Sequence, residues 1–220
     1  MLDTHARRED DRGVSDWLDD FILLFTIIDP IGSVPVFIAI ARRAPRGLRL
    51  SMALRSVGIA LFTLLFFIAL GKPLLDAIGI DLNAFRIAGG IVLFLFAIDM
   101  IFGQSKPERE VLEVDRETAL DMAVYPMAIP SIAGPGAILA VVVLSEEAPG
   151  LSGSLRVAGM TVAVLACVLV ALLAADRIER MIGDVGASII SRIMGLIVAA
   201  IAVQAIMTGI GGFFGIGPTP

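Results

Sequence analysis

Chemically reactive side chains are scarce in this sequence of 220 residues, which has one cysteine, one histidine, one tryptophan and one tyrosine. Cys167 lies in an apolar run and His5 in a polar N-terminal stretch, so the chain can form neither an internal disulfide nor a Cys/His metal site. Nucleophilic catalysis by a Cys/His or Ser/His pair is excluded for the same reason. The net charge of −5 comes mostly from acids in loops, which argues against a nucleic-acid partner.

Apolar residues dominate what is present: 57% of the residues are hydrophobic, 18% are charged and the mean hydropathy is +0.91. Because a transmembrane helix needs about 20 mostly apolar residues, we expect an all-α membrane protein. Residues 1–16 mix charges of both signs and are predicted to be a flexible polar leader, followed by a single membrane domain over residues 17–220. Six transmembrane helices are predicted, at residues 17–40, 52–70, 82–102, 122–144, 155–175 and 189–210.

The distribution of lysine and arginine predicts the orientation of the chain, because cytoplasmic loops are enriched in both. With six spans, the first, third and fifth loops and their flanks lie on one side and hold eleven of the seventeen basic residues. The side that carries both termini holds the other six. We therefore expect both termini on the extracytoplasmic side.

The two halves of the chain share short sequence motifs. The motif LRxxG occurs at 54–58 and 155–159, and the motif RIxGxIV occurs at 86–92 and 192–198. The offsets of 101 and 106 residues differ little, as expected if insertions are confined to loops. We interpret them as a three-span repeat, over about 17–103 and about 122–210. An odd number of spans inverts the second copy, as in many secondary transporters. A duplication that serves stability alone is the alternative.

Proline and glycine interrupt the first and fourth predicted spans near their centres, at residues 29–35 (DPIGSVP) and 126–136 (PMAIPSIAGPG). Proline removes a backbone donor and pushes the preceding residue out of helical geometry, so both helices are predicted to be broken there. Irregular backbone at this depth is tolerated beside a water-filled cavity, where the N-terminus of a half-helix suits an anionic group. A static kink for packing is the alternative. The predicted substrate-binding residues are Asp29, Pro30, Gly32, Ser33, Ser131, Gly134, Pro135 and Gly136.

The same two stretches carry a family resemblance. DPIGSVPVF at 29–37, together with IPSIAGPGAI at 129–138, resembles the paired signatures of the MarC family of six-span bacterial inner-membrane proteins. The similarity covers essentially the whole chain after the leader. The resemblance implies a protein of the bacterial cytoplasmic (inner) membrane. Members of the family are described as candidate transporters, and an archaeal relative is classed as a small neutral amino acid transporter. The family pattern often carries Asn where this chain has Asp29.

The favoured hypothesis is a secondary transporter, not an enzyme, that moves a small polar solute such as a neutral amino acid by alternating access. The expected partners are this solute and the lipid bilayer, with a homo-oligomer left open. No cofactor or metal is expected apart from a coupling proton or sodium ion. Asp29 is a candidate to bind that ion, and equally a candidate to cap its own turn through backbone amides. The alternatives are a channel or non-transporting scaffold and, remotely, an intramembrane aspartyl protease built on Asp29 and Asp99.

Two further groups of residues are assigned structural roles. Arginines at span ends are expected to snorkel toward the membrane interface: Arg55, Arg86, Arg156 and Arg192. Glycines within the third and sixth spans are expected to allow close helix packing: Gly89, Gly90 and Gly195.

Overall fold

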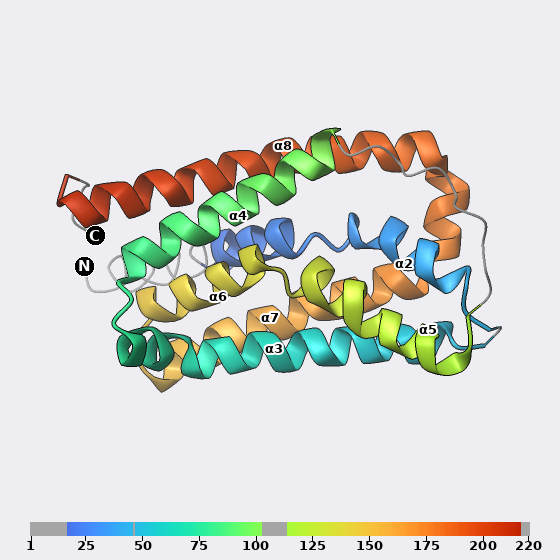
Figure 1. Cartoon of the computed structure of the whole chain (residues 1–220), viewed down its shortest axis with the longest axis horizontal. Coiled ribbons are helices and arrows are strands. Elements are labelled where there is room, and N and C mark those ends of the chain that lie inside the picture. Colours follow the sequence, from blue (N-terminus) through green and yellow to red (C-terminus); the bar gives the residue numbers. More distant parts are fainter. Residues whose placement is uncertain (1–16, 46, 103–113, 217–220) are drawn as a thin grey trace, which may run out of the picture.

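The computed structural model describes residues 17–45, 47–102 and 114–216, and every regular element in these ranges is a helix (Figure 1). A helix over residues 17–28 is followed by a turn over residues 29–32. The elements after it are α2 (Ser33–Ala41), α3 (Arg49–Ile78), α4 (Leu82–Phe102), α5 (Arg116–Met122), η1 (Ala123–Ile132), α6 (Pro135–Glu147), α7 (Leu151–Leu173) and α8 (Ala175–Phe214). The predicted leader lies outside the described residues.

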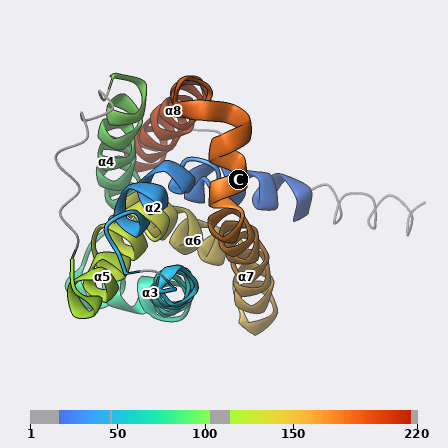
Figure 2. The ribbon, with the colours of Figure 1, turned by 90° about the vertical axis from the view of Figure 1, so that its right-hand side faces the viewer.

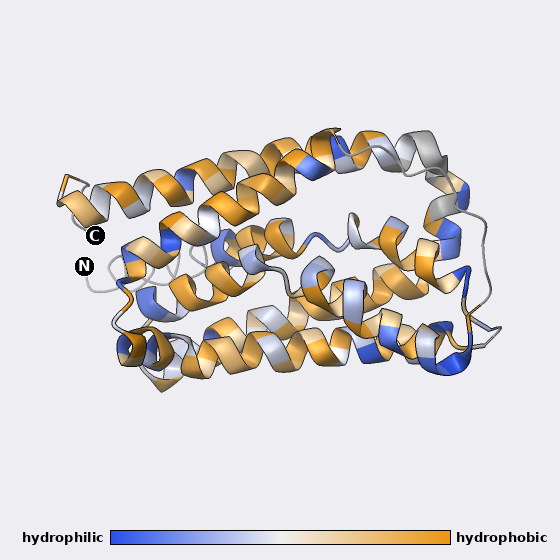
Figure 3. Ribbon diagram, in the orientation of Figure 1, coloured by the Kyte–Doolittle hydropathy of each residue, from blue (hydrophilic) through white to orange (hydrophobic). Residues whose placement is uncertain are grey.

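Five stretches are long and apolar enough to cross a membrane: Trp17–Ala41, Arg49–Ile78, Leu82–Phe102, Leu151–Leu173 and Ser188–Phe214. A sixth results if Arg116–Ile132 and Pro135–Glu147, which meet at an angle of 53°, are counted as one span. Figure 3 shows apolar residues along the helices and hydrophilic residues gathered at both ends of the bundle. The prediction of an all-α membrane protein is therefore confirmed, and the six predicted spans correspond to five candidate spans, or six if the bent pair counts as one.

Two stretches that we predicted as loops are helical. The predicted turn after the second span belongs to α3, which continues through Pro73 and ends at Gly79 in the left-handed conformation (φ 76°). Leu75 is buried, so this added turn contributes to the core. The stretch before the sixth predicted span also belongs to α8, whose path bends sharply at Gly183 (φ 65°, ψ 173°). In both places a glycine with positive φ, rather than a change in polarity, marks the end or the break.

The helices pair in a regular pattern. α3 packs against α7, α4 runs along α8, and α6 lies against both α3 and α4, while α2 contacts α7 and α8. Viewed end-on, α4 and α8 form one side of the bundle and α3 and α7 the other (Figure 2). The centre is filled by large, fully buried side chains from five elements, among them Leu24, Leu64, Met127, Val141 and Val164.

Glycines bring α4 and α8 into close contact. A Cβ atom on Gly90 would lie 3.0 Å from the carbonyl oxygen of Ala202, and one on Gly195 would lie 3.1 Å from the carbonyl oxygen of Ala97. Only glycine lets the two backbones approach this closely. The expected packing role of the three glycines is confirmed, since a Cβ atom on Gly89 would likewise lie 2.9 Å from Cδ2 of Leu139 on α6.

Candidate functional site

Asp29 caps the turn that interrupts the first span. It is 5% exposed and has a φ of 49°, in the left-handed region that Asp and Asn tolerate better than most residues. The backbone amide of Gly32 donates a hydrogen bond of 2.9 Å to Oδ1 of Asp29. Both the backbone amide and the hydroxyl of Ser33 donate to the carbonyl oxygen of Asp29, each at 3.1 Å. The carboxylate therefore serves backbone groups of its own turn.

Gly32 is required by the position of that carboxylate. A Cβ atom on Gly32 would lie 1.9 Å from Oδ2 of Asp29, far inside any allowed contact. Pro35, by contrast, falls in the first turn of α2, where a missing amide donor costs no hydrogen bond. The interruption is consequently short, and helical geometry resumes at Ser33.

The interruption in the second half is longer. Within η1, Tyr125 (φ −126°, ψ 122°) and Ile129 (φ −130°, ψ 122°) are extended, and each directly precedes a proline. Proline disfavours helical geometry in the residue before it, which accounts for both positions. Gly134 then caps α6, and a Cβ atom there would lie 2.5 Å from the carbonyl oxygen of Pro130. The chain turns by 53° at this point.

A small hollow lies beside this second stretch, with a volume of about 20 Å³. This volume suits about one water molecule and is too small for an amino acid. Besides the predicted residues of the second stretch, its lining consists of residues from the first span, α4, η1 and α6: Ile27, Val92, Leu93, Phe96, Pro130, Ile132 and Ala137.

The structure brings together four of the eight predicted substrate-binding residues, namely Ser131, Gly134, Pro135 and Gly136, around this hollow. The other four, Asp29, Pro30, Gly32 and Ser33, form the turn that follows Ile27 and do not line the hollow. The α4 residues Val92, Leu93 and Phe96 were not predicted, because an apolar side chain in a membrane helix carries no sign of which neighbour it faces. Gly136 permits the close approach of α4, since a Cβ atom there would lie 2.3 Å from Leu93 Cδ1.

The acids proposed for a protease dyad have different environments. Asp29 is buried in its turn, whereas Asp99 is exposed on α4. Among the residues that the structure describes, no three His, Cys, Asp or Glu side chains gather in a way that could hold a metal ion.

Ion pairs join the first half of the chain to the second half at both ends of the bundle. At the end where α3 finishes and α7 begins, Lys72 pairs with Glu146, Arg86 with Glu147 at 2.9 Å, and Arg156 with Asp20 at 2.9 Å. At the end where α3 begins, Arg49 pairs with Asp176, and Arg55 lies 4.0 Å from Asp121. Three of the arginines expected to snorkel thus have carboxylate neighbours on another helix, which the sequence analysis did not predict.

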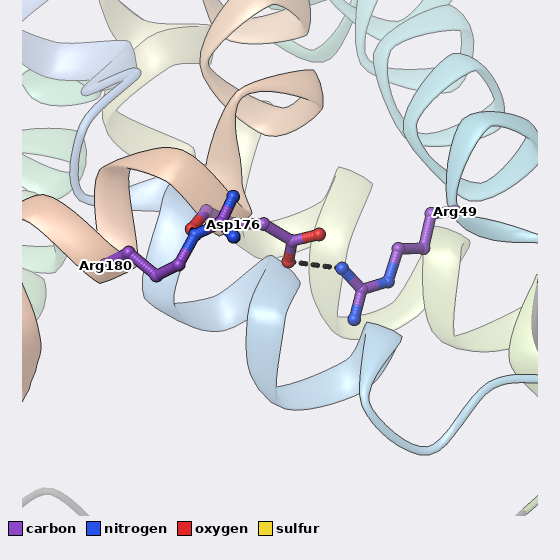
Figure 4. A network of polar contacts seen from close by, with 3 residues as sticks. All are labelled: Arg49, Asp176 and Arg180. Atoms are coloured by element: carbon purple, nitrogen blue, oxygen red, sulfur yellow. Dashed lines mark hydrogen bonds and ion pairs between the residues drawn. The ribbon is translucent and has the colours of Figure 1, made fainter.

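The pair at the start of α8 is part of a small polar network (Figure 4). Asp176 accepts from Arg49 through its side chain, and its carbonyl oxygen accepts a hydrogen bond of 3.0 Å from Nε of Arg180. The network borders a hollow of about 50 Å³ between α2, α3 and the junction of α7 with α8, and Arg49 and Asp176 form part of its lining. These contacts hold the first turns of α8 across the end of the bundle.

Comparison with known proteins identifies the family. The family model described as MarC family integral membrane protein matches residues 14–214. The UPF0056 membrane protein MJ1677 of Methanocaldococcus jannaschii is 39% identical over 193 residues, which cover 87% of this chain and 94% of the relative. The UPF0056 inner membrane protein YhgN of Escherichia coli K12 is 31% identical over 189 residues, 86% of this chain and 93% of the relative. No solved structure matches. The chain therefore belongs to the MarC family of integral membrane proteins.

Proposed function

We propose that this protein is a secondary transporter for a small polar solute, with a neutral amino acid as the first candidate. In this proposal the chain consists of two inverted three-span repeats whose first helices are broken, and transport occurs by movement of one repeat against the other. The protein carries out no enzymatic reaction. The observation that carries the proposal is the pair of helix interruptions in the middle of apolar spans, one in each half of the chain.

The pairing of helices supports an inverted repeat. Helices that would correspond to each other pack together, since α3 contacts α7 and α4 contacts α8. The contact of α4 with α6 likewise has a counterpart in the contact of α8 with α2. A pseudo-twofold axis in the membrane plane, passing between α4 and α8, relates these contacts.

The hollow beside Ser131 supports a site between the repeats. Its lining combines Ile27 and α4 from the first half with the interrupted stretch of the second half. The backbone around Gly134 is irregular within an apolar span, which is tolerated where protein or a wet cavity satisfies the polar groups. The volume of about 20 Å³ admits only about one water, so the hollow holds no solute in the described conformation. Binding of a solute would require the walls to separate, as alternating access demands.

Asp29 is the candidate for a coupling ion. It lies within the first span and is buried, and a charge in a membrane costs about 3 kcal/mol on insertion scales. A proton or sodium ion bound during transport would remove that cost. The hydrogen bond from Gly32 equally suits a capping role. The variant Asp29→Asn separates the two roles because it keeps the acceptor oxygen and removes the charge.

We propose a location in the cytoplasmic membrane, with both termini on the extracytoplasmic side. Support for the location comes from the name of the relative YhgN, an inner membrane protein. Support for the orientation comes from the basic residues, eleven of which belong to the first, third and fifth loops and their flanks.

Uptake by proteoliposomes tests the proposed function. Purified protein would be reconstituted, and uptake of labelled glycine and alanine measured under an imposed proton or sodium gradient. We expect protein-dependent uptake that Ser131→Ala reduces by raising KM, whereas the matched control Ser145→Ala leaves it unchanged. Ser145 is a half-buried serine of α6 whose hydroxyl bonds the carbonyl oxygen of Val141 in its own helix. Equal loss in both variants would refute the site, and unitary currents in a planar bilayer would indicate a channel instead.

A further inference from the structure

Two of the ion pairs that join the halves occupy equivalent positions in the sequence. Asp20 lies 101 residues before Asp121, and Arg55 lies 101 residues before Arg156, which is the offset of the LRxxG motif itself. In one pair Asp20 of the first half meets Arg156 of the second, and in the other Asp121 of the second half meets Arg55 of the first. Each pair thus joins the beginning of the first span of one half to the beginning of the second span of the other half.

The two pairs lie at opposite ends of the bundle. Arg55 is six residues into α3 and Arg156 is five residues into α7, and these helices begin at opposite ends (Figure 1). One pair therefore lies toward each face of the membrane. Movement of one half relative to the other would change the distance between the acid and the arginine in both pairs.

The pairs are in different states. Nη2 of Arg156 donates a hydrogen bond of 2.9 Å to Oδ2 of Asp20, and the side chains are 27% and 19% exposed. Nη2 of Arg55 lies 4.0 Å from Oδ1 of Asp121, beyond hydrogen-bond range, and these side chains are 43% and 72% exposed. A closed, partly desolvated pair stabilises a contact much more than an open, solvated one. The Asp20–Arg156 pair is therefore closed and the equivalent Asp121–Arg55 pair is open, although Arg49–Asp176 also joins the two halves at that second end.

This difference is what exchange between two mirror-related conformations would produce. If the halves rock against each other, the end that closes brings its acid and arginine together, and the end that opens separates them. The reverse conformation would then have a closed Asp121–Arg55 pair and an open Asp20–Arg156 pair. The contact between Arg49 and Asp176 has no equivalent in the other half. The residue 101 positions after Arg49 is Gly150, and the residue 101 positions before Asp176 is Leu75, so neither is charged.

We propose that Asp20–Arg156 and Asp121–Arg55 are alternating latches between the two halves, one at each membrane face, and that only one is closed in each conformation. The inference rests on the proposed function, because it takes alternating access as the movement that the latches control. In the described conformation, the latch at the face that carries the start of the first span is closed. None of the four residues lines the hollow at Ser131, so a latch variant would shift the conformation without altering that site directly.

Distances between spin labels at the two ends test the latches without any knowledge of the solute. In a Cys167→Ala background, one doubly labelled protein carries Trp17→Cys with Leu155→Cys, and another carries Leu54→Cys with Glu117→Cys. All four labelled positions are exposed. The distance distributions would be measured by pulsed electron paramagnetic resonance in liposomes.

Releasing the closed latch should open one end and close the other. For Asp20→Asn we expect a longer 17/155 distance together with a shorter 54/117 distance, with the ratio of the two populations changed by about fivefold. Asp121→Asn should shift both distances the opposite way, because it weakens the other conformation. Asp19→Asn and Asp99→Asn, which neutralise exposed acids outside the latches, should leave both distances unchanged. Arg156→Gln provides a second test if Asp20→Asn does not fold.

Distances that stay constant, or that lengthen at both ends together, would overturn the latch proposal. The test is separate from the transport assay. Reciprocal changes without flux of any solute would uphold the latches and refute transport, whereas flux with unresponsive distances would uphold transport and refute the latches.

Discussion

The turn at Asp29 gives a quantitative prediction about stability. Asp29 combines a positive φ with a side-chain acceptor for the amide of Gly32. In Asp29→Ala, the alanine must adopt a left-handed conformation, which costs about 1 kcal/mol in backbone strain. The lost hydrogen bond to the amide of Gly32 costs about 1 kcal/mol more. We therefore expect Asp29→Ala to lower the free energy of unfolding by about 2 kcal/mol. Asp29→Asn keeps the acceptor oxygen and tolerates positive φ, so we expect a change within about 0.5 kcal/mol.

A double-mutant cycle with Gly32 sharpens this prediction. In the wild type, Gly32→Ala places a methyl group where the carboxylate of Asp29 lies, so the carboxylate must move and the hydrogen bond is lost. In the Asp29→Ala background the same methyl group meets no carboxylate, and its additional cost should be close to zero. The two substitutions should therefore be strongly non-additive.

Unfolding of the detergent-solubilised protein, followed by circular dichroism against temperature and denaturant, measures these changes. The order of stability should be wild type about equal to Asp29→Asn, with Asp29→Ala clearly lower. If Asp29→Ala is as stable as Asp29→Asn, or if the effects of Asp29→Ala and Gly32→Ala simply add, the capping geometry derived for this turn is incorrect.

Three further predictions concern helix packing and capping. Gly195→Ala should destabilise the protein by about 1–3 kcal/mol through a clash with α4, whereas Gly159→Ala, with open space around it, should be neutral or stabilising in the same unfolding assay. Ser56→Ala should lower the free energy of unfolding by about 1 kcal/mol, because the Ser56 hydroxyl donates a hydrogen bond of 2.8 Å to the carbonyl oxygen of Ala123 on another element. Thr63→Ala loses only a hydrogen bond within its own helix and should lower the free energy of unfolding less. Hydrogen bonds from Thr118 lower the pKa of the Asp115 carboxylate in the folded protein. The ionised carboxylate should therefore stabilise the protein above the pKa that Asp115 has in the unfolded chain, and this stabilisation should disappear as the pH falls through the lowered folded-state pKa. Asp115→Asn, which keeps the cap, should flatten that pH dependence.

Hydropathy and proline explain how much of the fold could be predicted from the sequence. The third span was placed at its exact bounds, because apolar character begins at Leu82 and ends at Phe102. The ends of α3 and the start of α8 were missed because polar residues continue a helix at the membrane interface as readily as they form a loop. Proline predicted the extended geometry of Tyr125 and Ile129 from local sterics alone.

Tertiary contacts explain what the sequence could not supply. The turn of Asp29 could be foreseen because an Asx-type hydrogen bond is local, and the structure shows that bond. The contribution of α4 to the hollow depends on which face of α4 packs against its neighbours, and a single apolar side chain in the sequence does not indicate that face. The acid that pairs with Arg156 was missed although Asp20 and Asp121 share the offset of the two arginines. The sequence signal for both pairs is this shared offset of 101 residues between the two acids and between the two arginines.

Exchange across proteoliposomes tests the central claim, that this chain is an alternating-access transporter, most directly. Vesicles would be loaded with unlabelled alanine, and the entry of labelled alanine compared with entry into empty vesicles and into protein-free vesicles. The account predicts saturable, protein-dependent entry that internal alanine accelerates, because a loaded carrier returns faster than an empty one. Entry that does not saturate and ignores internal alanine would indicate a channel. The absence of protein-dependent entry for alanine and for a panel of other small polar solutes would contradict the account.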